Sequence, residues 1–187
     1  LEFPNGVVSV LTNGKSDAAI QLNPTGALST DELTMTMIAG LALGAHPQAN
    51  NAAVIGFGAG MSTHTALASR HIKQIDTIEI EPKMYEAARA FHAAVPRAFD
   101  DPRSHVYFDD ARTFFSTHAT GYDIIMSEPS NPWVSGIATL FTQEFYARAK
   151  ANLNADGVFV QWIHGFEISL PLLSSTVNAL GNAFEDY

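Results

Sequence analysis

The segment that most constrains the fold is a glycine-rich turn near residue 56. Three apolar residues, Ala53 to Ile55, lead into Gly56-Phe57-Gly58-Ala59-Gly60, and a helix-forming stretch continues to Arg70. This order predicts a buried strand that turns sharply into the N-terminus of a helix. Glycines suit the turn because its backbone adopts conformations that are costly for other residues, and because a ligand can approach where no Cβ is present. Together with the unpaired N–H groups of the helix start, the turn predicts a nucleotide-binding loop.

An acidic residue on the next strand strengthens this prediction. Residues 75–81 form a second short apolar segment, in which Glu79 lies 19 residues after Gly60. An acid that binds ribose hydroxyls is expected at about that distance from such a loop. The two signals together favour a nucleoside site containing Gly56, Gly58, Gly60 and Glu79 over a turn with a purely structural purpose.

Strand-like and helix-like segments alternate along the rest of the chain. Strands are predicted at 105–108, 122–126 and 158–163, and helices at 33–43, 82–95, 142–153 and 169–184. The alternation predicts an α/β fold with a doubly wound, mainly parallel sheet. Residues 6–22 predict a β-hairpin that turns at Asn13-Gly14. We therefore expect an N-terminal hairpin region over residues 1–30 and a nucleoside-binding catalytic domain over residues 31–187.

Acidic residues follow three of the predicted strands. Glu79, Asp110 and Glu128 each lie at the carboxyl end of a strand. Ligands of open parallel sheets bind outside these ends, so the three side chains should converge on one rim although they are far apart in sequence. For Asp110 a second explanation is equally good, because an aspartate at that position can cap the helix predicted to follow it.

Composition limits the possible partners. The chain of 187 residues is long enough for one domain with a substantial core, and it contains no cysteine, which excludes disulfides and thiolate metal sites. A net charge of −9 disfavours nucleic acid and favours a cationic substrate. No apolar run is long enough to span a membrane, and the histidines lack the spacing of a helical metal pair. We expect a cytoplasmic protein without metal, membrane or nucleic-acid contacts.

Several motifs together resemble the spermidine synthase family, over about residues 31–160. They are Gly56-Phe57-Gly58-Ala59-Gly60, Ile78-Glu79-Ile80-Glu81, Asp110-Ala111, the segment 122–132 and the segment 140–146. The motif that follows the predicted strand at 122–126 reads Ser127-Glu128-Pro129-Ser130-Asn131-Pro132-Trp133. In this form the motif resembles that of divergent spermidine synthase-like proteins. The resemblance implies a Rossmann-like fold of the S-adenosylmethionine-dependent methyltransferase type. It also implies transfer of an aminopropyl group from decarboxylated S-adenosylmethionine to a polyamine amine, a reaction of polyamine biosynthesis.

Roles for individual residues follow from the resemblance. Glu79 would hold the ribose hydroxyls, Asp110-Ala111 would bind the adenine, and the glycine loop would pass under the nucleoside. Glu128 would act on the acceptor amine as the proton-accepting catalytic group. Asn131 would orient that amine as a neutral hydrogen-bond partner.

The chain departs from the family pattern at three places. Ala59 replaces an acid that helps to hold the donor's ammonium group, Asn131 replaces a second aspartate, and Thr34-Met35 replaces a Tyr-Gln pair. Two alternatives therefore stay open. One is an S-adenosylmethionine-dependent N-methyltransferase, since Asn131-Pro132-Trp133 is similar to the Asn-Pro-Pro-aromatic element of such enzymes. The other is a catalytically inactive nucleoside-binding homologue.

The C-terminal end also differs from the expected fold. Folds of this kind usually close with two more strands after the last helix, whereas this sequence stops at Tyr187. We therefore expect a truncated C-terminal end with an open sheet edge, or a partner chain that covers the edge in a homodimer.

Overall fold

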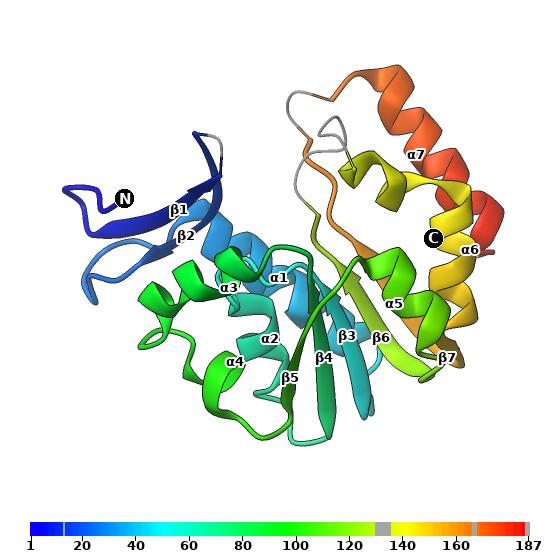
Figure 1. Cartoon of the computed structure of the whole chain (residues 1–187), viewed down its shortest axis with the longest axis horizontal. Helices are drawn as coiled ribbons and strands as arrows, with labels where there is room; N and C mark the ends of the chain where they lie inside the picture. The colour runs from blue at the N-terminus through cyan, green and yellow to red at the C-terminus, as the bar shows by residue number, and fades with distance from the viewer. Residues whose placement is uncertain (13, 130–135, 166–167, 186–187) are drawn as a thin grey trace.

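Five parallel strands form the central sheet of the computed structural model, which describes residues 1–12, 14–129, 136–165 and 168–185 (Figure 1). The predicted doubly wound α/β fold is confirmed, because the strand that leads into the glycine loop lies in the middle and the order reverses beside it. Across the sheet the strands are β5 (Ser104–Phe108), β4 (Gln74–Glu79), β3 (Asn51–Ile55), β6 (Tyr122–Ser127) and β7 (Leu153–Gln161).

Helices cover both faces of the sheet, which is why its central strands are almost entirely buried. On one face, Ile38 and Ala42 pack against Val54 and Met126. On the other, Phe114, Phe145 and Tyr146 pack against Ile125. The first face carries α1 (Thr30–Ala45) and α2 (Met61–Ala66), and the second carries α5 (Ala111–Thr117), α6 (Gln143–Ala151) and α7 (Leu170–Ala183).

Two helix boundaries differ from the sequence prediction. Helix α1 begins earlier than expected, because Ser29 caps it and Glu32 completes a capping box. Helix α2 ends at Ala66 instead of continuing to Arg70. The guanidinium of Arg103 donates hydrogen bonds to the carbonyls of Leu67, Ser69 and Ile72 at 2.8 to 3.1 Å, so it satisfies the backbone where α2 has stopped.

The single helix expected at 82–95 is divided. It consists of α3 (Pro82–Ala88) and the short 3-10 helix η1 (Arg89–Phe91), and a separate helix α4 (Pro96–Asp100) follows. Val95 has a non-helical backbone immediately before Pro96, as the proline ring requires. The proline therefore begins a new helix as well as ending the preceding segment.

Further along the chain, a 3-10 helix η2 (Ile137–Phe141) precedes α6. Strand β7 begins at Leu153 and ends at Gln161, whereas the sequence predicted a strand at 158–163. Strand β7 pairs only with β6 among the described residues, as β5 pairs only with β4 at the other side of the sheet. The expected truncation itself stays a prediction.

The predicted N-terminal hairpin is present as β1 (Val7–Thr12) and β2 (Lys15–Gln21), which form a separate antiparallel sheet. Asn13 lies outside the described residues. Ala18 and Ile20 of β2 belong to the same buried cluster as Phe57 and Ala59, so the hairpin packs against the glycine loop. In the part of the chain that the structure describes, no helix has the length and apolar character needed to cross a membrane.

Candidate functional site

The glycine loop connects β3 to α2 at the carboxyl edge of the sheet. Gly56 and Gly60 have φ angles of 92° and 80°, in the left-handed region, and Gly58 lies between them with a φ of 51°. A Cβ on Gly56 would lie 3.2 Å from the carbonyl oxygen of Glu128, and one on Gly60 would lie 3.0 Å from the ring of Phe57. Glycine is thus required both by the backbone conformation and by the close approach of neighbouring groups.

Glu79 ends β4 directly beside this loop and is only 6% exposed. Its Oε2 atom accepts a hydrogen bond from the backbone N–H of Phe57 at 2.8 Å, and its Oε1 atom accepts one from Glu81 at 2.8 Å. Burial raises the pKa of the Glu79 carboxyl, and the backbone hydrogen bonds oppose that rise. Since each carboxylate oxygen can accept more than one hydrogen bond, Glu79 can hold the loop and still bind hydroxyls.

Asp110 follows the end of β5, where the N–H of its neighbour Asp109 donates to the Glu79 carbonyl at 3.1 Å. The Oδ1 atom of Asp110 caps α5 by accepting from the N–H groups of Arg112 and Thr113 at 2.9 and 3.2 Å. The same oxygen lies 3.3 Å from Nε of Arg112. The capping explanation is therefore confirmed. The cap uses one carboxylate oxygen, so the second could still accept a hydrogen bond from an amino group such as that of adenine. Ala111, the other residue predicted to bind the adenine, is buried in the core.

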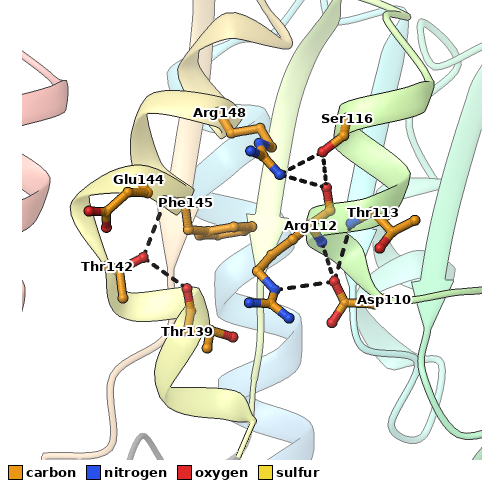
Figure 2. Close-up of a pocket in the computed structure, with 9 residues that line it drawn as sticks. All are labelled: Asp110, Arg112, Thr113, Ser116, Thr139, Thr142, Glu144, Phe145 and Arg148. Carbon is orange, nitrogen blue, oxygen red and sulfur yellow. Dashed lines mark hydrogen bonds and ion pairs between the residues drawn. The ribbon is translucent and has the colours of Figure 1, made fainter.

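A pocket of about 540 Å³ lies between α5, η2 and α6, and Asp110 stands at one end of it (Figure 2). The Arg112 side chain reaches toward Asp110, and the Phe145 ring lies between the two helices. Arg148 donates to the Arg112 carbonyl at 3.1 Å, which links α6 to α5. The other residues lining the pocket are Thr113, Ser116, Thr139, Thr142 and Glu144.

Glu128 follows β6 at the point where the order of the strands reverses. Its N–H donates to the carbonyl of Ile55 at 3.0 Å, and its Oε1 atom is buried without a hydrogen-bond partner among the described residues. Burial raises the pKa of Glu128 from 4.5 to about 7, and the nearby Ser62 hydroxyl opposes that rise. A carboxyl group with such a pKa can exchange a proton at neutral pH, as a general base must.

The backbone brings the three predicted acids to one edge. Gly56 donates to the carbonyl of Ile78 at 2.9 Å, one residue before Glu79, and Gly56 also approaches the backbone of Glu128. Asn131 and Trp133 lie outside the described residues, so their predicted roles stay predictions.

Two further polar side chains at this edge were not predicted from the sequence. Ser127 and Gln161 are partners in the register of β6 and β7. The Ser127 hydroxyl and the Gln161 Oε1 atom are both buried without a hydrogen-bond partner among the described residues, as is Oε1 of Glu128. Buried polar atoms normally have partners, so each of these three atoms could accept a hydrogen bond from a polar group that binds at this edge. The sequence signal was a polar residue, Gln161, within the otherwise apolar segment 158–163.

Two exposed apolar side chains lie at the part of the edge formed by β4 and β5. Ile80 is 70% exposed directly after Glu79, and Phe108 is 51% exposed at the end of β5. Their positions at strand ends, beside Glu79 and Asp110, suit the face of a flat aromatic ligand.

Three of the positions that depart from the family pattern, Ala59, Thr34 and Met35, lie among the described residues and have structural roles. Ala59 is completely buried in the cluster under the hairpin. Met35 is buried, and its carbonyl accepts a hydrogen bond from the Ser62 hydroxyl at 3.2 Å. The Thr34 hydroxyl donates to the carbonyl of Thr30 at 3.0 Å within α1.

A group of possible metal ligands lies at the opposite ends of the strands. Atoms of His46, Asp123 and Asp156 lie within 4.8 Å of one another. Asp123 already accepts hydrogen bonds from the N–H groups of Asn50 and Asn51, at 2.6 and 3.2 Å, so it holds the start of β3 against β6. The expected absence of a metal stays a prediction.

Solved structures with the same arrangement show the fold. A spermidine synthase in complex with the transition-state analogue AdoDATO matches with a TM-score of 0.78 and 23% identity, over 95% of this chain and 66% of that chain. The spermidine synthase from Thermotoga maritima matches with a TM-score of 0.75 and 24% identity, over 95% of this chain and 65% of that chain. A SAM-bound amino pentose methyltransferase from Micromonospora echinaspora matches with a TM-score of 0.53 and 21% identity, over 73% and 52% of the two chains. The Rossmann-like methyltransferase fold is thus confirmed.

Sequence comparisons lead to the family. The polyamine aminopropyltransferase of Bacillus subtilis is 32% identical over 124 residues, which are 66% of this chain and 45% of that protein. The one from Alkaliphilus oremlandii is 30% identical over 124 residues, 66% of this chain and 43% of its own length. The chain therefore spans less than half the length of these relatives. The family model of the spermine/spermidine synthase domain matches residues 32–187. The chain belongs to the spermine/spermidine synthase family.

Proposed function

We propose that the protein is an aminopropyltransferase that moves an aminopropyl group from decarboxylated S-adenosylmethionine to a polyamine amine. The observation that carries the proposal is the enclosed Glu128 carboxyl, which has a pKa raised to about 7 by burial and stands beside the glycine loop. Similarity to polyamine aminopropyltransferases supports the same reaction. The nucleoside would lie over Gly56, Gly58 and Gly60, with its ribose at Glu79 and its adenine at Asp110.

The reaction needs a group that accepts a proton. A polyamine nitrogen has a pKa near that of lysine, about 10, so most of it is protonated and lacks the lone pair that attacks carbon. In the proposed step the amine nitrogen forms a bond to the carbon next to the sulfonium. The carbon–sulfur bond breaks, its electron pair stays on sulfur to give methylthioadenosine, and Glu128 takes the proton that nitrogen loses.

The polar atoms around Glu128 suit an ammonium or amine ligand. The Glu128 carboxyl presents a buried oxygen atom that lacks a partner among the described residues. An ammonium group has only donors to offer, so it would give this oxygen a partner. Glu128 would then bind and orient the acceptor nitrogen.

The test is to incubate the protein with decarboxylated S-adenosylmethionine and putrescine and to quantify methylthioadenosine and spermidine by mass spectrometry. We expect both products from the wild type and none from Glu128→Gln, with methylthioadenosine affinity changed by less than about threefold in the variant. Glu86→Gln is the matched control, since Glu86 is exposed and pairs with Lys83 away from the loop.

Other outcomes would change the assignment. Normal turnover by Glu128→Gln would remove Glu128 from the mechanism, and an unfolded variant would indicate that Glu128 braces the following loop instead. Methyl transfer from S-adenosylmethionine would support the N-methyltransferase alternative. Binding of the nucleoside without turnover by the wild type would support an inactive homologue.

A further inference from the structure

We infer that His46, Asp123 and Asp156 form a binding site for a zinc ion, at the ends of the strands opposite the glycine loop. One atom of each side chain that can bind a metal lies within 4.8 Å of the others. The sequence predicted no metal, because the histidines lack the spacing of a helical pair. These three ligands come from distant positions, so only the fold brings them together. The site lies away from the glycine loop and plays no part in the proposed reaction.

His46 supplies a buried imidazole. It caps the C-terminal end of α1, where its N–H donates to the carbonyl of Ala42 at 3.0 Å and its carbonyl accepts from Ala49 at 3.1 Å. The side chain is only 14% exposed, and both ring nitrogens are buried without a hydrogen-bond partner among the described residues. Since buried polar atoms are normally satisfied, a cation bound to one of the ring nitrogens would supply a missing partner.

Asp123 supplies a buried carboxylate that its neighbours hold in place. It is 8% exposed. Its Oδ2 atom accepts from the N–H groups of Asn50 and Asn51, and its Oδ1 atom accepts from the side-chain amide of Asn154 at 2.6 Å. Each carboxylate oxygen can accept two hydrogen bonds, so Oδ1 keeps one electron pair for a cation. Carboxylates that bind metals are commonly oriented by hydrogen bonds of this kind.

A bulge in β7 brings Asp156 to the other two ligands. At this place a single residue of β6, Asp123, faces residues 154–157 of β7. The extra residues leave the ladder, and the Oδ2 atom of Asp156 lies 3.4 Å from Nε2 of His46. The Asp156 side chain is 80% exposed, so an ion bound here could keep a water molecule as a further ligand.

One imidazole and two carboxylates favour zinc over magnesium or calcium, which prefer sites made of oxygen atoms. Zinc has no geometric preference of its own, and it is often bound by three protein ligands and water. Its bonds to nitrogen and oxygen are about 2.0 to 2.2 Å long, which places tetrahedral ligand atoms about 3.4 Å apart. The distance between His46 and Asp156 matches this value. The two carboxylates also balance the charge of the ion.

The experiment titrates the protein with ZnCl₂ in competition with a chelating dye, after dialysis against EDTA and then against metal-free buffer. The wild type should bind one zinc ion with a dissociation constant of about 10 μM or lower. Asp156→Asn and His46→Gln should each weaken binding at least about tenfold, because each removes a ligand. Zinc should raise the melting temperature of the wild type but not of Asp156→Asn. In EDTA the two proteins should unfold alike, since Asp156 is exposed.

His92 and Asp100 provide matched controls. Their side chains form a similar pair, with Nε2 2.8 Å from Oδ2, but no third ligand joins them among the described residues. His92→Gln and Asp100→Asn should therefore change zinc affinity by less than about twofold.

Three results would overturn the inference. The first is a dissociation constant of the wild type above about 10 μM. The second is equal weakening by the control variants, because zinc would then bind to exposed histidines in general. The third is magnesium that protects the wild type against unfolding as well as zinc does, because the imidazole would then not be a ligand.

Discussion

The carboxylate of Glu79 accepts a hydrogen bond of 2.8 Å from the N–H of Phe57, a residue 22 positions earlier in the chain. This bond fixes the glycine loop to the end of β4. The ring of Phe57 is held in turn by Tyr85 and Phe99, with centroid distances of 4.9 and 5.2 Å. One carboxylate therefore shapes the loop and, under the proposed function, also binds the ribose that rests on it.

Replacement of this carboxylate should affect binding and stability together. In Glu79→Gln the amide can accept only one of the two backbone hydrogen bonds, and its NH₂ group then faces the other N–H donor. We expect methylthioadenosine affinity to fall by roughly 2 to 3 kcal/mol and the melting temperature to decrease. Calorimetric titration and thermal unfolding measure the two effects, with Glu86→Gln as the control. Unchanged affinity in a folded Glu79→Gln protein would show that Glu79 only supports the loop.

At Asp110 the capping and binding roles can be separated by the choice of substitution. Asp110→Ala removes the cap of α5 and should cost about 1 kcal/mol of stability. Asp110→Ser keeps a capping oxygen and should retain most of that stability, but it lacks the carboxylate that would accept from the adenine amino group. Both variants should bind methylthioadenosine more weakly, as measured by titration calorimetry. Wild-type affinity in Asp110→Ser would leave Asp110 with its capping role alone.

The sheet could be predicted because the residues that specify each strand are neighbours in the sequence. β3, β4 and β6 are short apolar runs, and each is followed by a glycine or an acid, so their number, direction and functional edge follow from periodicity and from the rule for parallel sheets. Gly56, Glu79 and Glu128 were located at that edge for the same reason. The helix boundaries, the division of the helix predicted at 82–95 and the bounds of β7 needed correction. Propensity alone does not show where contacts with neighbouring elements end a helix or extend a strand.

The remaining features depend on contacts between residues far apart in sequence. Arg103 reaches the carbonyls after α2 from more than 30 positions away, and no pattern around residue 66 indicates that partner. The Ser62 hydroxyl bonds to Met35, 27 positions earlier, so its place beside Glu128 becomes visible only in the folded chain. Gln161 reaches the edge of the sheet in the same way, through the pairing of β7 with β6. The chemistry of such side chains depends on burial, which the sequence does not specify.

The stability of the protein should depend on pH through Glu128. Its pKa in the folded state is about 7, above the ordinary 4.5, so folding favours the neutral carboxyl. The stabilising effect is complete below pH 4.5 and is lost as the pH rises through about 7, where burial of the charge becomes unfavourable.

Glu128→Gln stays neutral at every pH and should escape this loss. Its melting temperature relative to the wild type should therefore increase between about pH 5 and about pH 8, by an amount equivalent to at most about 3 kcal/mol, since one pKa unit corresponds to about 1.4 kcal/mol. Thermal unfolding of both proteins across this range measures the difference, and the exposed control Glu86→Gln should show no such trend. A difference that stays constant with pH would mean that the Glu128 carboxyl titrates near its ordinary pKa. In that case Glu128 would lack the affinity for protons that the proposed mechanism assigns to it.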